Sequence, residues 1–202
     1  MILGAIFVPK IIGLMRQKIV ECSQRDTSTN CVPHYLYLLD QPKISEKQII
    51  TFFAKNNSAL EREYLEKIIK FYHIEAKRES INTVVAIAQM ALETGFLRFT
   101  GAVKKSQNNF AGIGCIRTNY QGHSFATIEE GIRAHIQHLK AYASPAQLCT
   151  SCMDPRRKFI ENSQFFGKLR TVYDLSEVWA MDKNYGEKLA QLIQDLLNTA
   201  IL

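Results

Sequence analysis

The most informative stretch of this chain covers residues 86–96 and reads AIAQMALETGF. Its apolar residues up to Leu92 are typical of a buried helix, and Gly95 suits the left-handed backbone with which helices commonly end. Asn82 precedes the stretch, and its side chain can cap the first turn of a helix. We therefore predict a helix that begins after Asn82 and carries one carboxyl group, that of Glu93, in its last turn.

Glu93 is a candidate general acid because of this position. The negative end of the helix dipole disfavours its ionised form, and the apolar neighbours Met90, Leu92 and Phe96 withhold water from it. A carboxylic acid that stays protonated near neutral pH is what general acid catalysis of glycosidic bond cleavage requires. A solvated glutamate at a frayed helix end explains this segment equally well, so other residues must decide.

A group of amide, aromatic and glycine residues follows at positions 107–114, which read QNNFAGIG. Amides can bind the hydroxyl and acetamido groups of a sugar, and an aromatic ring can stack on its apolar face. Glycines let the backbone approach a ligand closely. The segment adds a candidate sugar-binding surface downstream of the candidate acid.

Four ordered motifs together resemble one enzyme family. They are ALETGF at 91–96, QNNFAGIG at 107–114, EGIRAHIQHLKAY at 130–142, and WA at 179–180 with DKNYG at 182–186. This combination is similar to the glucosaminidase-type peptidoglycan hydrolases, family 73 of the glycoside hydrolases, which include the hydrolase domain of flagellar rod-cap proteins. The resemblance runs from about Ile44 to the C-terminus.

The resemblance implies a mainly α, lysozyme-like helical domain with a small β-hairpin beside the cleft. It implies that Glu93 is the catalytic acid and that Tyr185 is the family tyrosine near the acid, where it would orient substrate or stabilise the transition state. A core tyrosine at the start of a helix is the alternative for Tyr185. Trp179, the only tryptophan, is either a sugar platform or a packing residue. The candidate substrate-binding residues are Gln89, Asn108, Asn109, Phe110 and Gly112.

The second catalytic group stays unassigned. An inverting glycosidase needs a carboxylate about 6.5–9.5 Å from the acid, and a retaining one needs a closer group. Glu129 and Glu130 are candidates by position, although Glu130 also fits a helix cap after Thr127. Asp154 and Asp182 are weaker candidates. A third route uses the acetamido group of the sugar itself as the nucleophile.

We expect an N-terminal extension with a linker at residues 1–42 and a glucosaminidase-like catalytic domain at residues 43–202. The extension starts apolar, but it lacks a basic start and Lys10 interrupts it. It is therefore a poor secretion signal, and it is too short for a stable membrane span. Export to the periplasm, the cell envelope or the medium is expected from the function alone.

Turn and cap signals predict the local structure of the catalytic domain. Ser45 with Gln48, and Ser58 with Glu61, have the spacing of capping boxes and predict two helices. Residues 119–122, NYQG, predict the turn of the hairpin.

The composition limits the choice of partners. Lys and Arg number 25 against 19 Asp and Glu, and the net charge of +6 favours an anionic polymer such as a bacterial wall. The charges are scattered and form no basic stripe with interleaved aromatic residues, so we expect no nucleic-acid partner. We expect glycan strands of peptidoglycan as the partner, no cofactor, and a monomer.

The five cysteines form an odd set, so at least one is unpaired within the chain. His135 and His138, together with Cys149 and Cys152, have a spacing that can bind zinc. The two histidines also fit the family motif without any metal, and one pair of cysteines is a weak signal. We predict no metal site.

The sequence is compatible with three functions. The first is an endo-β-N-acetylglucosaminidase that cleaves the N-acetylglucosaminyl bond of peptidoglycan with Glu93 as general acid. The second is a lysozyme-like muramidase or lytic transglycosylase, which cuts the other glycan bond and needs only one acid. The third is a non-catalytic wall-binding protein, against which the presence of Glu93 in its motif argues.

Overall fold

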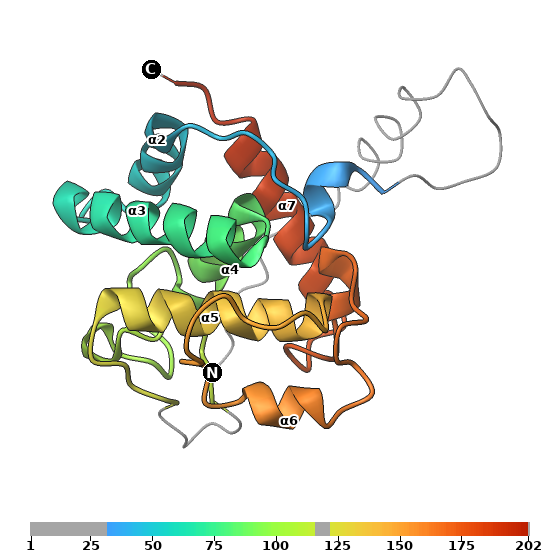
Figure 1. Ribbon diagram of the computed structural model, residues 1–202. Coiled ribbons are helices and arrows are strands. Elements are labelled where there is room, and N and C mark those ends of the chain that lie inside the picture. Colours follow the sequence, from blue (N-terminus) through green and yellow to red (C-terminus); the bar gives the residue numbers. More distant parts are fainter. Residues whose placement is uncertain (1–31, 116–121, 202) are drawn as a thin grey trace, which may run out of the picture. The chain divides into compact units, whose positions relative to one another are not determined.

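Helix α4 (Thr83–Thr94) forms the centre of the fold in the computed structural model, which describes residues 32–115 and 122–201. Every residue of α4 is buried except Leu92 and Glu93. A helix that is apolar all round must be covered on all sides. Helices α3 (Arg62–Glu79), α5 (Ile128–Ala143) and α7 (Tyr185–Leu197) provide this cover (Figure 1).

The described part of the chain is mainly helical, as predicted. Residues from 33 onward form one compact unit. In addition to the four helices above, it contains α2 (Glu46–Asn56), α6 (Arg157–Glu161) and short 3-10 helices at His34–Leu36, Lys105–Gln107 and Val172–Leu175. The described residues form no strand, only two isolated bridges, Tyr37 with Thr171 and Ser176 with Ala180. Within them, no helix combines the length and apolar character needed to cross a membrane.

Both ends of α4 are determined by the predicted residues. The Oδ1 atom of Asn82 accepts hydrogen bonds from the backbone N–H groups of Val84 and Val85. Gly95 follows the helix in a left-handed conformation with φ of 58°. The amide nitrogen of Asn82 also donates to the carbonyl oxygens of Tyr35 and Tyr37, which anchors residues 35–37 to the start of α4.

The other capping predictions have mixed outcomes. Ser45 caps α2 by accepting from the N–H of Gln48, and Thr127 caps α5 in the same way, as predicted. The prediction that Ser58 opens the next helix is wrong, because α3 begins one turn later, with Glu61 as its N-cap residue. The N–H of Leu60 bonds to the carbonyl of Asn57 and closes a separate turn before α3.

The predicted β-hairpin is not shown. Most of its turn falls at residues 116–121, which lie outside the described residues. On the described sides of the turn, the N–H of His123 donates to the carbonyl of Ile113 over 2.8 Å, but neither side forms a strand.

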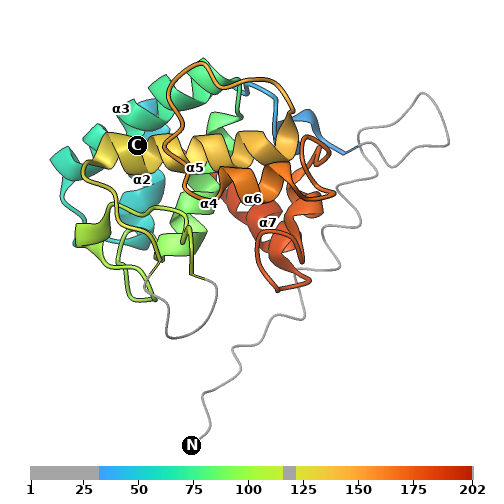
Figure 2. The same cartoon turned by 60° about the horizontal axis from the view of Figure 1, so that its bottom comes forward.

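Two groups of loops flank the C-terminal end of α4 (Figure 2). One is the segment 95–115, and the other comprises α6 and the residues that precede α7. A small apolar cluster on α5 and the first loop brings the two groups together. It consists of Ala111, Ile113 and Ala134, with Phe125, Met153 and Trp179 packed against it.

The approach of α5 to the first loop is closest at Gly131. A β-carbon there would lie 1.7 Å from the backbone oxygen of Asn108. We predict that Gly131→Ala lowers the free energy of unfolding by about 1–3 kcal/mol through overpacking, although alanine favours helices. Urea unfolding measures the effect. Gly101→Ala is the control, since a β-carbon there meets nothing within 4 Å, and equal destabilisation of both variants would contradict the packing argument.

Candidate active site

Glu93 lies in a cleft of about 440 Å³, a volume in the usual range for ligand sites. One wall is the segment 111–115, and the other comes from α5, α6 and residues 178–181. Among the described residues that line the cleft, Glu93 has the one carboxyl group. The last turn of the central helix therefore presents its acid between the two groups of loops.

The two carboxyl oxygens of Glu93 have different surroundings. Its Oε1 accepts hydrogen bonds from the hydroxyl of Tyr185 over 2.5 Å and from the indole N–H of Trp179 over 3.1 Å. Its Oε2 has no hydrogen-bond partner among the described residues. It lies beside Gly112, where a β-carbon would come within 3.5 Å of it. Protein donors thus bind Oε1, whereas Oε2 lies next to the cleft wall at Gly112.

The pKa of the Glu93 carboxyl is raised above its ordinary value. The main cause is burial, which disfavours the charged carboxylate. The hydrogen bonds from Tyr185 and Trp179 stabilise the carboxylate and act in the opposite direction. The net direction is the one expected from the sequence.

Tyr185 and Gln89 lie together with Glu93. The amide nitrogen of Gln89 donates to the Tyr185 hydroxyl over 2.8 Å, and Gln89 is fully buried. Tyr185 begins α7, and the next residue, Gly186, has room only for hydrogen because a β-carbon would lie 2.6 Å from the Cα of Tyr173. Gln89 therefore supports the tyrosine and does not line the cleft.

The amides predicted to bind sugar mainly organise the first loop. Asn109 is fully buried, with Oδ1 accepting from the N–H of Ile113 and Nδ2 donating to the carbonyls of Ile113 and His123. The Nδ2 of Asn108 donates to the carbonyl of Phe125. Phe110 is fully buried. These three residues give the loop its shape, whereas Gly112 lies in the cleft wall.

The direct contact of Trp179 with the candidate acid was not foreseen from the sequence. Its ring also packs against His135, His138 and Tyr142, with centroid distances of 5.7, 4.9 and 6.2 Å. Two features of the sequence could have indicated this contact. Trp179 lies only six residues before Tyr185, and its indole N–H needs a hydrogen-bond acceptor when it is buried.

The sequence analysis also missed the rim of the cleft. Phe159 and Met181 line it and are 66% and 91% exposed. The guanidinium of Arg156 lies 4.5 Å from the ring centre of Phe159. The rim thus presents apolar surface and a positive charge to solvent.

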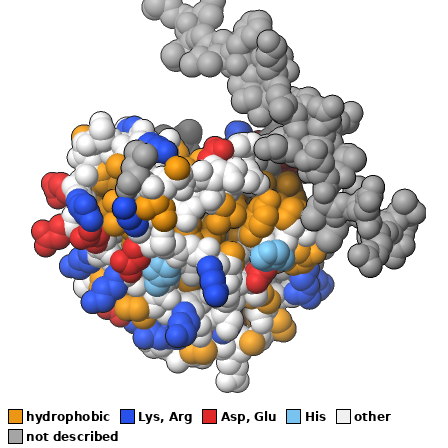
Figure 3. Space-filling view, turned by 90° about the horizontal axis from the view of Figure 1, so that it is seen from above, with side chains coloured by type: hydrophobic (Ala, Val, Ile, Leu, Met, Phe, Trp, Pro, Cys, Tyr) orange, Lys and Arg blue, Asp and Glu red, His pale blue; other side chains and the backbone are white. Residues whose placement is uncertain are grey.

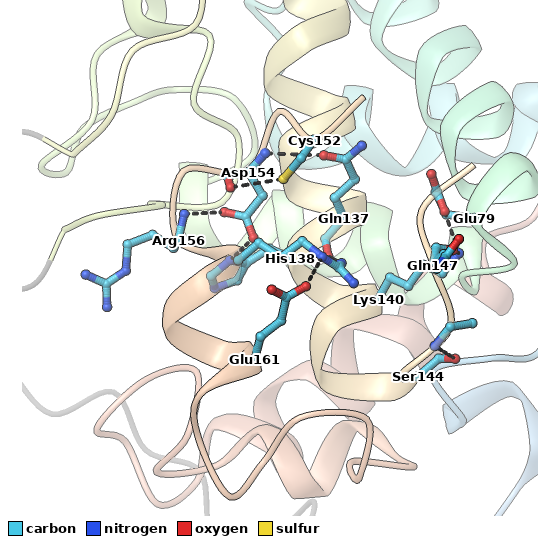
Figure 4. Close-up of polar contacts among 12 residues, drawn as sticks. Glu79, Gln137, His138, Lys140, Ser144, Gln147, Cys152, Asp154, Arg156 and Glu161 are labelled. Carbon is cyan, nitrogen blue, oxygen red and sulfur yellow. Dashed lines mark hydrogen bonds and ion pairs between the residues drawn. The ribbon is translucent and has the colours of Figure 1, made fainter. Parts of the chain in front are cut away.

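Buried polar contacts tie the segment 147–156 to α5 (Figure 4). Gln137 accepts from the N–H groups of Met153 and Asp154. The carboxylate of Asp154 bonds Nδ1 of His138 over 2.8 Å. Lys140 donates to the carbonyl of Gln147 over 2.8 Å and also forms a buried ion pair with Glu79 of α3 over 2.6 Å. These contacts fix the outer wall of the cleft and engage Asp154 fully.

The other carboxylates considered as a second catalytic group lie outside the cleft. Glu129 pairs with Arg133, and Asp182 pairs with Lys188 over 2.6 Å. Glu130 accepts from the N–H of Ala126 over 2.9 Å, in keeping with a capping role.

The four residues with zinc-like spacing do not converge on one point. Both ring nitrogens of His135 have hydrogen-bond partners, and His138 is bonded to Asp154. The thiols of Cys149 and Cys152 are exposed. Within the described residues, no group of three or more His, Cys, Asp or Glu side chains could hold a metal ion.

A helical fold with a single carboxyl group among the described residues of its cleft is compatible with a glycosidase. Comparison with known proteins agrees. The Glucosaminidase family, described as mannosyl-glycoprotein endo-beta-N-acetylglucosaminidase, matches residues 69–198. The chain is 37% identical over 181 residues to an uncharacterized protein of Borreliella burgdorferi, with 90% of this chain and 85% of that protein covered. No solved structure matches the chain significantly. The chain belongs to the glucosaminidase family, and the family predicted from the four motifs is confirmed.

The raised pKa of Glu93 has a consequence for stability. The folded state binds the proton more tightly than the unfolded state, so Glu93 lowers the free energy of unfolding as pH rises above the ordinary pKa of a glutamate. We predict that Glu93→Gln is as stable as the wild type at low pH, where both side chains are neutral, and more stable at neutral pH. Urea unfolding at both pH values measures the difference, and a constant difference would contradict the assigned direction.

Proposed function

We propose that this protein is an endo-β-N-acetylglucosaminidase that hydrolyses the N-acetylglucosaminyl bond of peptidoglycan strands, with Glu93 as general acid. The observation that carries the proposal is the pair of unlike oxygens on Glu93, one held by Tyr185 and Trp179 and one facing the cleft. Family membership supports the substrate class.

In the proposed first step, Glu93 gives its proton from Oε2 to the oxygen of the departing sugar. The bond between that oxygen and the anomeric carbon breaks, and Glu93 becomes a carboxylate. The O–H of Tyr185 and the N–H of Trp179 stabilise the new charge through Oε1. Such preorganised donors act most strongly where charge develops in a partly dry site.

The cleft favours a route without a second carboxylate. Glu93 has the one carboxyl group among its described lining residues, and residues 116–121, IRTNYQ, contain no Asp or Glu. We propose that the acetamido oxygen of the cleaved N-acetylglucosamine attacks the anomeric carbon as the leaving oxygen departs. Water then attacks that carbon, the bond between the carbon and the acetamido oxygen breaks, and the water gives one proton to the Glu93 carboxylate. The acetamido group and the acid are both restored.

The surface is compatible with binding to a bacterial wall. On the face drawn in Figure 3, Lys and Arg side chains are interspersed with Asp and Glu, and apolar side chains lie between them. The net charge of +6 attracts the protein to an anionic wall over a longer range. Peptidoglycan lies outside the cytoplasm, so we propose that the protein acts there, as a monomer with residues 43–202 as its catalytic domain.

The general acid is tested with Glu93→Gln. We predict that the wild type clears a suspension of purified cell walls and that the variant is slower by roughly 10²–10⁴-fold, the usual contribution of a general acid. Glu129→Gln is the matched control, because Glu129 pairs with Arg133 outside the cleft, and it should act like the wild type. If the wild type binds walls without clearing them, the wall-binding alternative replaces the enzyme.

A cleft with one acid also fits a lytic transglycosylase, the second candidate function. The reducing ends of the products separate the two. New N-acetylglucosamine ends support the proposal, whereas new muramic acid ends, free or as an internal anhydride, would show cleavage of the other bond.

The acetamido route is tested with substrate instead of protein. We predict that walls chemically stripped of N-acetyl groups are hydrolysed at least about a hundredfold more slowly, because the intramolecular nucleophile is lost. The same walls after chemical re-acetylation serve as the control and should recover. Equal rates on stripped and intact walls would mean that another group activates water.

A further inference from the structure

A chain of buried hydrogen bonds continues from Glu93 into the core. Beyond Tyr185 and Gln89, the Oε1 atom of Gln89 lies 3.0 Å from Nε2 of His135, and Nδ1 of His135 lies 2.8 Å from the hydroxyl of Tyr72. Tyr72, Gln89 and His135 are all fully buried. The chain thus connects helices α3, α5, α4 and α7 in turn and ends on the candidate acid.

Each link has one donor and one acceptor, so the chain can run in either of two directions. In the first, Tyr72 donates to Nδ1 of His135, Nε2–H of His135 donates to Gln89, and Gln89 donates to Tyr185. Tyr185 then donates to Oε1 of Glu93, and the proton of the acid must sit on Oε2. In the second direction the amide of Gln89 is turned over, so that its oxygen accepts from Tyr185 and its nitrogen donates to Nε2 of His135. Every link is then reversed, and Glu93 must carry its proton on Oε1 to donate to Tyr185.

The surroundings of Tyr72 favour the first direction. Among the described residues, the hydroxyl of Tyr72 has His135 as its one hydrogen-bond partner. If His135 donated to it, the hydroxyl proton would be left unpaired in a fully buried site, which is costly. Burial also lowers the pKa of His135 to about 3, so the ring is neutral and has one N–H only.

We propose that Tyr72 and His135 are positioning residues that set the donor-to-acceptor direction of this series of hydrogen bonds. They thereby hold the catalytic proton of Glu93 on Oε2, facing the cleft. The reversed chain would keep that proton on Oε1, between the carboxyl group and Tyr185, where a substrate in the cleft cannot take it. Neither positioning residue lines the cleft. The inference rests on the proposed role of Glu93 as general acid.

The direction of the hydrogen-bond series can be measured without substrate. In the ¹⁵N-labelled wild type, the chemical shifts of the imidazole nitrogens distinguish the tautomers of the five histidines. The signals of His135 are identified by their loss in His135→Gln. We expect a neutral ring protonated on Nε2 throughout the range of activity. A ring protonated on Nδ1, or a charged ring, would overturn the proposal.

The role of Tyr72 is tested by Tyr72→Phe. Without the hydroxyl, either direction leaves one nitrogen of His135 unpaired, so the strong preference, worth roughly tenfold or more, is lost. We expect the ¹⁵N shifts of His135 to move toward those of a mixture of tautomers. On soluble glycan fragments, kcat should fall by up to about twofold, to the fraction of molecules in the productive direction, with KM unchanged.

Tyr64→Phe is the matched control on the same helix. The hydroxyl of Tyr64 is buried without a partner among the described residues, so its loss should change neither the His135 shifts nor kcat. A Tyr72→Phe variant that keeps the wild-type tautomer and kcat would remove Tyr72 from the proposal. If Tyr72→Phe does not fold, the wild-type tautomer decides. If the wild type lacks activity, the proposed function fails. The tautomer of His135 still reports the direction of the hydrogen-bond series in that case.

Discussion

Burial of the apolar helix α4 is the constraint on which the rest of this structure depends. Three long helices cover α4, and its N-terminus is held by Asn82, which both caps the helix and anchors the segment before it. Only the last turn reaches the surface, where Leu92 and Glu93 are partly exposed. The candidate acid is consequently attached to a helix that is buried along nearly its whole length, and precise placement of a reacting group depends on such support.

The same burial creates a demand for polar partners. Gln89 lies in the buried, apolar middle of α4, and a buried amide must find hydrogen bonds on both of its ends. Tyr185 and His135 provide them. The residues around Glu93 are therefore linked by hydrogen bonds to side chains of the core that do not line the cleft.

Several features were predictable because their causes are local. Asn82, Ser45 and Thr127 act as caps within one turn, and Gly95 ends α4 through its own backbone. The prediction at Ser58 failed because a separate turn, closed by a backbone bond to Asn57, competes with the capping box. The direction of the Glu93 pKa was also anticipated, since apolar neighbours in the same helix contribute to its burial.

The sequence by itself determined the family, the central helix with its caps, and the position of a carboxyl group in the last turn of that helix, because motifs and capping act over short distances along the chain. Only the tertiary structure decided the partners of that acid. Trp179 and Tyr185 come from segments more than eighty residues away, and His135 and Tyr72 join them from two other helices. It also showed that Asn109 and Phe110 are buried within their loop. Such contacts arise when distant segments pack around α4, and the spacing of residues along a chain does not specify which buried polar groups will meet.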